Sequence, residues 1–306
     1  MKVGTRLLVT ALAAGMVGTA LVAPGAAYAG PATQSTGAQP AGALPGEDLA
    51  AARAARDTEP RPVVSPELKA IIAEKDREAN AYVAKKMAHK AARAKNNVMA
   101  EAGPATPMAV GVMANHPCPD GDCSWWAISA NQQAQVNNYY CGPATLSEAV
   151  GARGIGISQY TAAASLGTNS DGTAWYNGSY PMANSLNNYL GSQGAYYAAV
   201  NLSGSPSASE KSSYKTRLMS NIDRGWAVAG DAYEYHGYPH LVGHPVDKDI
   251  FHWFEIRGYE GYGATTWYED SVAGASSISW SNKVPAYSSL PSDSIVTIMG
   301  GRGYVW

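Results

Sequence analysis

The sequence predicts an α+β fold for the larger part of the chain, because helix signals come first there and strand signals follow. Helix signals cluster between residues 141 and 225, and runs of aromatic and β-branched residues dominate from residue 226 to residue 299. Near residue 110 the composition shifts, since Tyr, Trp, Gly and Ser become common and charged residues become rare. We therefore expect one α+β domain over residues 110–306.

Each element of this domain has a local signal. The predicted helices run from Cys141 or Gly142 to Val150, over 158–167, over 181–191 and over 207–225. In the last of these, Ser207 and Glu210 form a capping box. The predicted strands are 226–235, 250–259, 265–272 and 294–299. All four strands follow the last helix, and helices followed by an antiparallel sheet are typical of an α+β fold.

Three segments precede this domain. Residues 1–29 combine a basic start, an apolar run and small residues at Ala27 and Ala29, which is typical of a cleaved signal peptide rather than a retained membrane anchor. Residues 30–46 are rich in Pro, Gly and Ala and are expected to be a disordered linker. Residues 47–109 are charged and Ala-rich, and Ser65 and Pro66 begin a long helix there. This helical segment is either a stalk or a propeptide that covers the active site.

A signal peptide places the protein outside the cell, which changes how its three cysteines are interpreted. Cys118 and Cys123 flank the turn sequence PDGD and can form a disulfide across it. Cys141 is then left over, and an odd cysteine in a secreted protein is reactive, paired with another chain, or buried.

Charge excludes one class of partner. Residues 47–101 carry eleven basic and nine acidic side chains, whereas residues 102–306 carry nine and fifteen. An acidic domain lacks the basic surface that nucleic acids require, so no nucleic-acid partner is expected. No membrane contact is expected after signal cleavage either, because no later segment has the roughly twenty apolar residues of a spanning helix.

The stretch QVNNYYCGPAT places Cys141 at the start of a predicted helix. Gly142 and Pro143 suit a helix start, where the missing N–H of proline costs nothing. The positive end of the helix dipole favours a thiolate, which is the nucleophilic form of cysteine. Gln135, six residues upstream, could donate a hydrogen bond to an oxyanion, and Gln132 and Gln133 compete for that role.

A nucleophilic cysteine also needs a base and a group that orients it. His252 begins the strand segment HWFEIRGY, and a hairpin centred on Gly261 would place Asp270 opposite it. A carboxylate at that position would fix the tautomer of the imidazole and favour its charged form. A shift of one residue in register would place Ser271 opposite His252 instead.

In their order and spacing, QVNNYYCGPAT, HWFEIRGYE and WYED resemble the papain-like cysteine peptidases of the bacteriocin-processing, double-glycine-leader family and their secreted relatives. The resemblance covers about residues 130–272. It implies a papain-like fold with Cys141 as nucleophile, His252 as base, Asp270 as orienting carboxylate and Gln135 as oxyanion donor. The implied activity is hydrolysis of peptide bonds, with a peptide or protein as substrate.

Two departures limit what the resemblance implies. The family often has Pro after the Asp, whereas this sequence has Ser271. The best-known members are fused to membrane transporters, but this sequence has neither a later spanning segment nor a GxxxxGK phosphate loop. Cleavage of double-glycine leaders is therefore not implied, and a secreted monomer without cofactor or metal is expected.

Three alternatives remain open at this point. Cys123 in GDCSWW resembles the nucleophile motif of NlpC-type cell-wall peptidases, although Trp125 replaces its glycine. His236, His240 and His244 are four residues apart, but Gly and Pro between them break a helix, so a surface loop is favoured over a metal site. The domain could also be catalytically silent and bind peptides or cell-wall glycans through its aromatic surface.

Overall fold

A computed structural model of the chain describes residues 62–96 and 123–306. The predicted signal peptide, the linker and Cys118 lie outside the described residues, so these expectations, including the disulfide to Cys123, stay predictions. Within the described residues, no helix is both long and apolar enough to cross a membrane.

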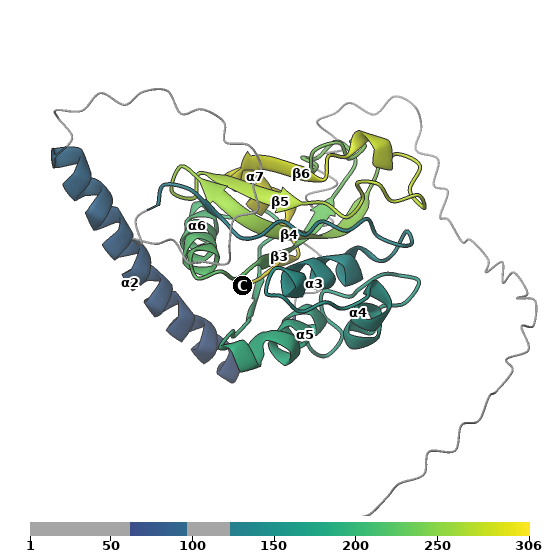
Figure 1. Ribbon diagram of the computed structural model, residues 1–306, viewed down its shortest axis with the longest axis horizontal. Helices are drawn as coiled ribbons and strands as arrows, with labels where there is room; N and C mark the ends of the chain where they lie inside the picture. Colours follow the sequence, from purple (N-terminus) through teal and green to yellow (C-terminus); the bar gives the residue numbers. More distant parts are fainter. Residues whose placement is uncertain (1–61, 97–122) are drawn as a thin grey trace, which may run out of the picture. The chain divides into compact units, whose positions relative to one another are not determined.

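The centre of the described domain is an antiparallel sheet of seven strands (Figure 1). Six strands follow the order β2-β7-β3-β4-β5-β6, and the short β1 pairs with β4. The strands are β1 Trp126–Ala127, β2 Ala199–Asn201, β3 Val228–Glu234, β4 Ile250–Glu260, β5 Thr265–Glu269, β6 Tyr287–Pro291 and β7 Gly303–Val305. The longest strands, β3 and β4, pair along the whole length of β3, which makes this pair the rigid centre of the sheet.

Helices cover the sheet and largely match the sequence signals. They are α3 Cys141–Gly151, α4 Gln159–Leu166, α5 Pro181–Leu190, α6 Ala208–Asp223 and α7 Ser292–Ile298, with short 3₁₀ turns at Gly191–Gln193 and Ser281–Lys283. Figure 1 shows α3, α4 and α5 grouped together, and of these α3 packs on β3 and β4. The capping box of α6 is present in both directions, between Ser207 and Glu210. The predicted α+β fold is therefore confirmed.

One predicted strand is wrong. Residues 294–299 belong to the helix α7 and the residues that follow it, not to a strand. The run is rich in β-branched residues, which favoured a strand, but its buried residues Ile295, Val296, Ile298 and Met299 share one helix face. Packing of that face decided the structure over intrinsic propensity. The short strands β1, β2, β6 and β7 had no sequence signal strong enough to predict them.

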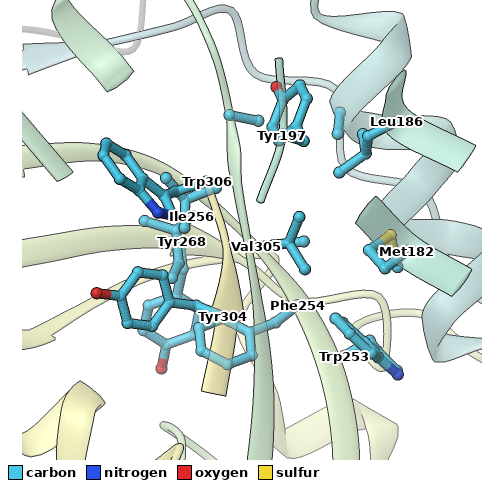
Figure 2. Packing of buried hydrophobic residues seen from close by; sticks show 14 of the residues in the cluster. Met182, Leu186, Tyr197, Trp253, Phe254, Ile256, Tyr268, Tyr304, Val305 and Trp306 are labelled. Atoms are coloured by element: carbon cyan, nitrogen blue, oxygen red, sulfur yellow. The ribbon is translucent and has the colours of Figure 1, made fainter. Parts of the chain in front are cut away.

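The core lies between the sheet and the helices (Figure 2). Aromatic side chains from β4 and the C-terminal strand dominate it, namely Trp253, Phe254, Tyr304 and Trp306, and α5 adds Met182 and Leu186. Each of these side chains is at most 2% exposed, and burying one stabilises the fold by about 1.5–3 kcal/mol. This packing fixes β4, which carries His252.

The long helix predicted after Ser65 is α2, Pro66–Asn96, and Ser65 caps it by accepting the Leu68 N–H at 3.2 Å. It packs on α6 through charged contacts. Lys86 and Asp223 form a fully buried ion pair at 2.7 Å. Arg217 makes two bonds of 2.7 Å to the Asp76 carboxylate. These contacts attach the helix to residues other than the candidate catalytic ones, and a propeptide function of residues 47–109 stays a prediction.

Candidate active site

Cys141 is the first residue of α3 and is 8% exposed, so its thiol lies at the positive end of the helix dipole. The position of this helix start is fixed by Gly142. A Cβ atom on Gly142 would lie 2.1 Å from Oγ1 of Thr173, so only glycine fits there. The predicted start of the helix is confirmed.

His252 lies near the start of β4 and is 3% exposed. Its Nε2 atom is 3.0 Å from Oδ1 of Asp270, which is fully buried just after β5. The angle of this contact is poor for a hydrogen bond, so its attraction is chiefly coulombic. The structure thus brings together the histidine and the carboxylate that the sequence singled out.

The predicted register of this hairpin is wrong. Glu255 pairs with Glu269 and Ile256 with Tyr268, and an irregularity follows before Gly258. The chain reverses over residues 261–264, with Tyr262 in the left-handed region at φ 57°, instead of turning at Gly261. Neither Asp270 nor Ser271 lies opposite His252 on the ladder. The contact forms because the Asp270 side chain reaches back from the segment beyond β5.

Charge and burial act in opposite directions on this pair. Burial lowers the pKa of His252, but the charge of Asp270 and the neighbouring Cys141 outweigh it, so the pKa is raised well above its usual value. Burial raises the pKa of Asp270, but the charges of His252 and His244 lower it by more than burial raises it, so the pKa falls well below its usual value. The site therefore favours an imidazolium at His252 beside a carboxylate at Asp270.

Gln135 is buried and its amide is held in one orientation. Its Oε1 accepts the hydroxyl of Ser271 at 3.2 Å, and its Nε2 donates to the Asn137 carbonyl at 2.7 Å. Among the described residues this is the one acceptor for that amide, so its second N–H is left for another oxygen. Ser271, the departure from the family pattern, thus contributes the hydroxyl that orients Gln135.

Gln132, the competitor, has both amide hydrogens engaged. Its Nε2 donates to the carbonyls of Asp270 at 2.9 Å and Ala273 at 3.1 Å. Gln132 therefore holds the segment after β5 in place, and of these two glutamines Gln135 is the better oxyanion donor.

A family model described as Peptidase_C39 like family matches residues 128–288. The chain belongs to this family. A comparison with curated proteins finds no match. The matched region contains Gln135, Cys141, His252 and Asp270, and it confirms the resemblance and the papain-like fold that it implied. A C39-like peptidase family supports cysteine peptidase activity for this chain.

The family match also bears on the rival nucleophile. Cys123 lies outside the matched residues, whereas Cys141 lies within them and is among the groups that raise the pKa of His252. Cys123 precedes the short strand β1, and its carbonyl accepts the hydroxyl of Tyr259 at 3.4 Å. In this C39-like domain the histidine and the carboxylate thus belong with Cys141.

The loop 236–249 differs from the expected surface loop. His240 places its ring nitrogens near the carbonyls of Tyr238 and Lys248, at 2.5 and 2.9 Å. His244 is instead buried, with Nδ1 2.7 Å from Oε2 of Glu234 and Nε2 3.0 Å from Oδ2 of Asp270. His244, expected on a surface loop, is therefore buried, and its partner Glu234 was not predicted as a site residue. The one signal available was an acidic residue, Glu234, in a strand segment whose other charged residue is Asp231.

Among the residues that the structure describes, two groups of side chains have possible metal-ligand atoms close enough together to hold a cation. They are His244, His252 and Asp270, and a second group of Glu148, Glu255 and Glu269. Mutual ion pairing accounts for the first group. The second group is buried on α3, β4 and β5, and its members lie on the same elements as, or next to, the three candidate catalytic residues.

The close approach of the three glutamates in the second group is explained by bound protons rather than by a cation. Burial raises the pKa of Glu269 to about 7. Both of its oxygens accept the Asn131 N–H at 3.0 Å, and Nε of Arg257 lies 3.2 Å away; these two contacts lower the pKa, so Glu269 ionises first of the three. Burial raises the pKa of Glu148 and of Glu255 well above the usual value, and the charge of Glu269 raises both further. We interpret Glu148 and Glu255 as acids that stay neutral while Glu269 ionises near pH 7.

Proposed function

We propose that the protein is a secreted cysteine peptidase that hydrolyses peptide bonds through a thioester on Cys141. The observation that supports this most is the buried His252–Asp270 ion pair beside a cysteine at a helix N-terminus. Family membership supports the reaction class, while the roles of the individual residues are inferred from the geometry.

In the proposed reaction, the Cys141 thiolate attacks the carbonyl carbon of the substrate and an oxyanion forms. The free N–H of the Gln135 amide and backbone N–H groups at the start of α3 stabilise that oxyanion. The His252 imidazolium gives its proton to the leaving amine as the C–N bond breaks and the thioester remains. His252 then takes a proton from water, the hydroxide attacks the thioester, and the C–S bond breaks so that the Cys141 thiolate leaves and the acid is released, which restores the thiolate and the His252 imidazolium.

The proposed substrate is a peptide or protein outside the cell, cell-wall peptides included, and the proposed form is a monomer. Secretion rests on the signal-peptide pattern of residues 1–29. The intact mass of the protein from culture medium would test it, because cleavage after Ala29 leaves Gly30 as the first residue. A mass that includes residues 1–29 would contradict secretion by cleavage.

Thiol labelling tests the proposal without a known substrate. The full chain is treated with iodoacetamide at pH 5.5 without reductant, and the modified residue is mapped by mass spectrometry. An ordinary cysteine, with a pKa of about 8.5, hardly reacts at this pH. We expect fast labelling confined to Cys141, and a loss of at least tenfold in rate in the His252→Gln variant.

Each other result has a defined meaning. Labelling of Cys123 would move the nucleophile to the rival motif. Slow labelling of Cys141, equal in wild type and His252→Gln, would favour a catalytically silent domain that binds peptides or glycans. A screen of a peptide library by mass spectrometry, with Cys141→Ala as the control, would then define cleavage specificity if the first result holds.

A further inference from the structure

His244 is enclosed by charged and aromatic groups, although it comes from a loop. Both nitrogens of its fully buried side chain lie next to carboxylates, Nδ1 at 2.7 Å from Glu234 and Nε2 at 3.0 Å from Asp270. The ring centroids of His252 and Trp280 lie 5.1 and 4.9 Å away, on edge-to-face contacts. A histidine in a surface loop has no need of such an environment.

The two carboxylates determine the protonation state of His244. A carboxylate oxygen only accepts hydrogen bonds, so a ring nitrogen that faces one must carry a proton. Since both nitrogens of His244 face carboxylates, the geometry requires the doubly protonated, cationic ring. The pKa agrees, because burial lowers it but the charges of Glu234 and Asp270 raise it to about 9.

Glu234 is as firmly held as His244. It is fully buried at the end of β3, and its Oε1 accepts the Leu241 N–H at 2.6 Å. On β3, Glu234 lies two residues after Ala232, which pairs with His252, so Glu234 and His252 are on the same face of the sheet. The rigid β3–β4 pair therefore places Glu234 at a fixed distance behind the candidate triad.

We propose that Glu234 and His244 are positioning residues of the active site, in which His244, held as a cation by Glu234, fixes Oδ2 of Asp270 so that Oδ1 faces His252. This rests on the proposed function of Cys141, His252 and Asp270. Successive contacts connect Cys141 to His252, His252 to Asp270, Asp270 to His244 and His244 to Glu234. A single carboxylate between two imidazolium rings cannot rotate away from either, which is the preorganisation that a catalytic base requires.

The charged groups in contact with His244 come from three parts of the chain. Glu234 approaches from β3, His252 from β4 and Asp270 from the segment after β5. Tyr268 on β5 is a further titratable neighbour, since its hydroxyl accepts the Val242 N–H at 2.9 Å, two residues from His244. Burial raises the pKa of Tyr268 well above its usual value, so Tyr268 stays neutral and adds no charge between pH 4 and pH 10.

The Glu234→Gln variant tests the charge of His244. The amide can accept the Leu241 N–H with its oxygen and donate to Nδ1 with its nitrogen, so His244 keeps its bond to Asp270 but becomes neutral. The rate of Cys141 alkylation by iodoacetamide is measured from pH 4 to pH 10 on the full chain. Loss of a cation 5.1 Å from His252 increases the proton affinity of both Cys141 and His252. We expect two transitions in the profile, one at which Cys141 loses its proton and one at which His252 loses its proton. Both should move up by about one pH unit in the variant.

The Glu234→Gln, His244→Met double variant tests the bond to Asp270. Methionine fills the space of the ring but donates no hydrogen bond, so Oδ2 of Asp270 loses its partner. We expect alkylation on the plateau between the two transitions to fall by about 10–100-fold. His236→Gln, at an exposed histidine in the same loop, is the matched control and should leave the profile unchanged.

A purely structural role gives a different result. If the pair only ties the loop 236–249 to β3, both variants lower the unfolding temperature while the alkylation profile stays where it is, and the proposal is wrong. The ¹⁵N spectrum of the histidine rings in the full chain decides the matter even if wild-type Cys141 is unreactive. The signal of His244, identified by its absence in the double variant, should show two protonated nitrogens up to about pH 9. One unprotonated nitrogen at pH 7 would overturn the proposal.

Discussion

Replacing Glu255 by glutamine should make the protein more stable at neutral pH, although the residue is completely buried. Both carboxylate oxygens of Glu255 lack a hydrogen-bond partner among the described residues. One carboxylate oxygen of Glu255 lies within 4.8 Å of a carboxylate oxygen of Glu148 and of Glu269. With an effective dielectric constant of about 20, two charges at that distance repel by about 3.5 kcal/mol. Ionising Glu255 beside Glu269 is therefore unfavourable, and the folded protein keeps its proton.

The sign of the pH dependence follows from this retained proton. The folded pKa of Glu255 is raised above the unfolded value of 4.5. Below pH 4.5 both states carry the proton, and the group contributes no pH dependence. As pH rises above 4.5, the unfolded state loses its proton and the folded state does not, so stability falls by about 1.4 kcal/mol per pH unit. Glutamine does not titrate and removes this loss.

Urea unfolding followed by tryptophan fluorescence measures the effect at pH 5, 6 and 7. The difference in unfolding free energy between Glu255→Gln and wild type should change in favour of the variant by about 2–3 kcal/mol from pH 5 to pH 7. Glu260→Gln, at an exposed position on the same strand, is the control and should show no such trend.

Two results would refute the reasoning. A difference between variant and wild type that is independent of pH would show that Glu255 has an ordinary pKa. Stabilisation of the wild type by added calcium, lost in Glu255→Gln, would show that the three carboxylates are ionised and hold a cation instead of protons.

Two further predictions follow from the geometry around α3 and α2. Gly142→Ala should slow alkylation of Cys141 at pH 5.5 by at least about tenfold, because the new Cβ would lie 2.1 Å from Thr173 Oγ1 and displace the helix start. A second substitution, Thr173→Gly, should restore the rate. The control Gly156→Ala should have no effect, since nothing lies within 4 Å of a Cβ there. Lys86→Met should leave Asp223 buried without its cation, at a cost of about 3–5 kcal/mol, and so speed amide hydrogen exchange of residues 66–96 by at least about 100-fold. The control Lys85→Met, on the exposed side of the helix, should leave the exchange rate unchanged. Unchanged exchange in Lys86→Met would mean that the ion pair does not hold the helix.

The elements that the sequence predicted well are those with local signals. The N-cap Ser158 and the left-handed Gly167 bound α4, and the capping box of α6 forms as expected. Such signals lie within a few residues of one another, so the physical cause is visible in the sequence. The helix α7 was missed because its burial, not its propensity, determines its structure.

The candidate site was predictable only in part, for a similar reason. Cys141 and His252 have local signals, one at a helix start and the other at the start of a strand. Asp270 was chosen for its position opposite His252, and that register was wrong, yet its side chain still contacts His252 at 3.0 Å. His244 and Glu234 could not be predicted, since they meet only because the loop 236–249 folds back on β3. Contacts made by loops depend on the whole fold and not on nearby sequence.

The buried glutamates show what it costs to assemble this site from three separate elements. Glu148 lies on α3 with Cys141, Glu255 on β4 with His252, and Glu269 directly before Asp270. Bringing the thiol to the histidine and the histidine to the carboxylate therefore also brings three acids together. If all three were ionised, each pair would repel by about 3.5 kcal/mol and push α3 away from β4. Protons on Glu148 and Glu255, and Arg257 beside Glu269, remove that repulsion, so the protonation of these acids and the geometry of Cys141 and His252 depend on each other.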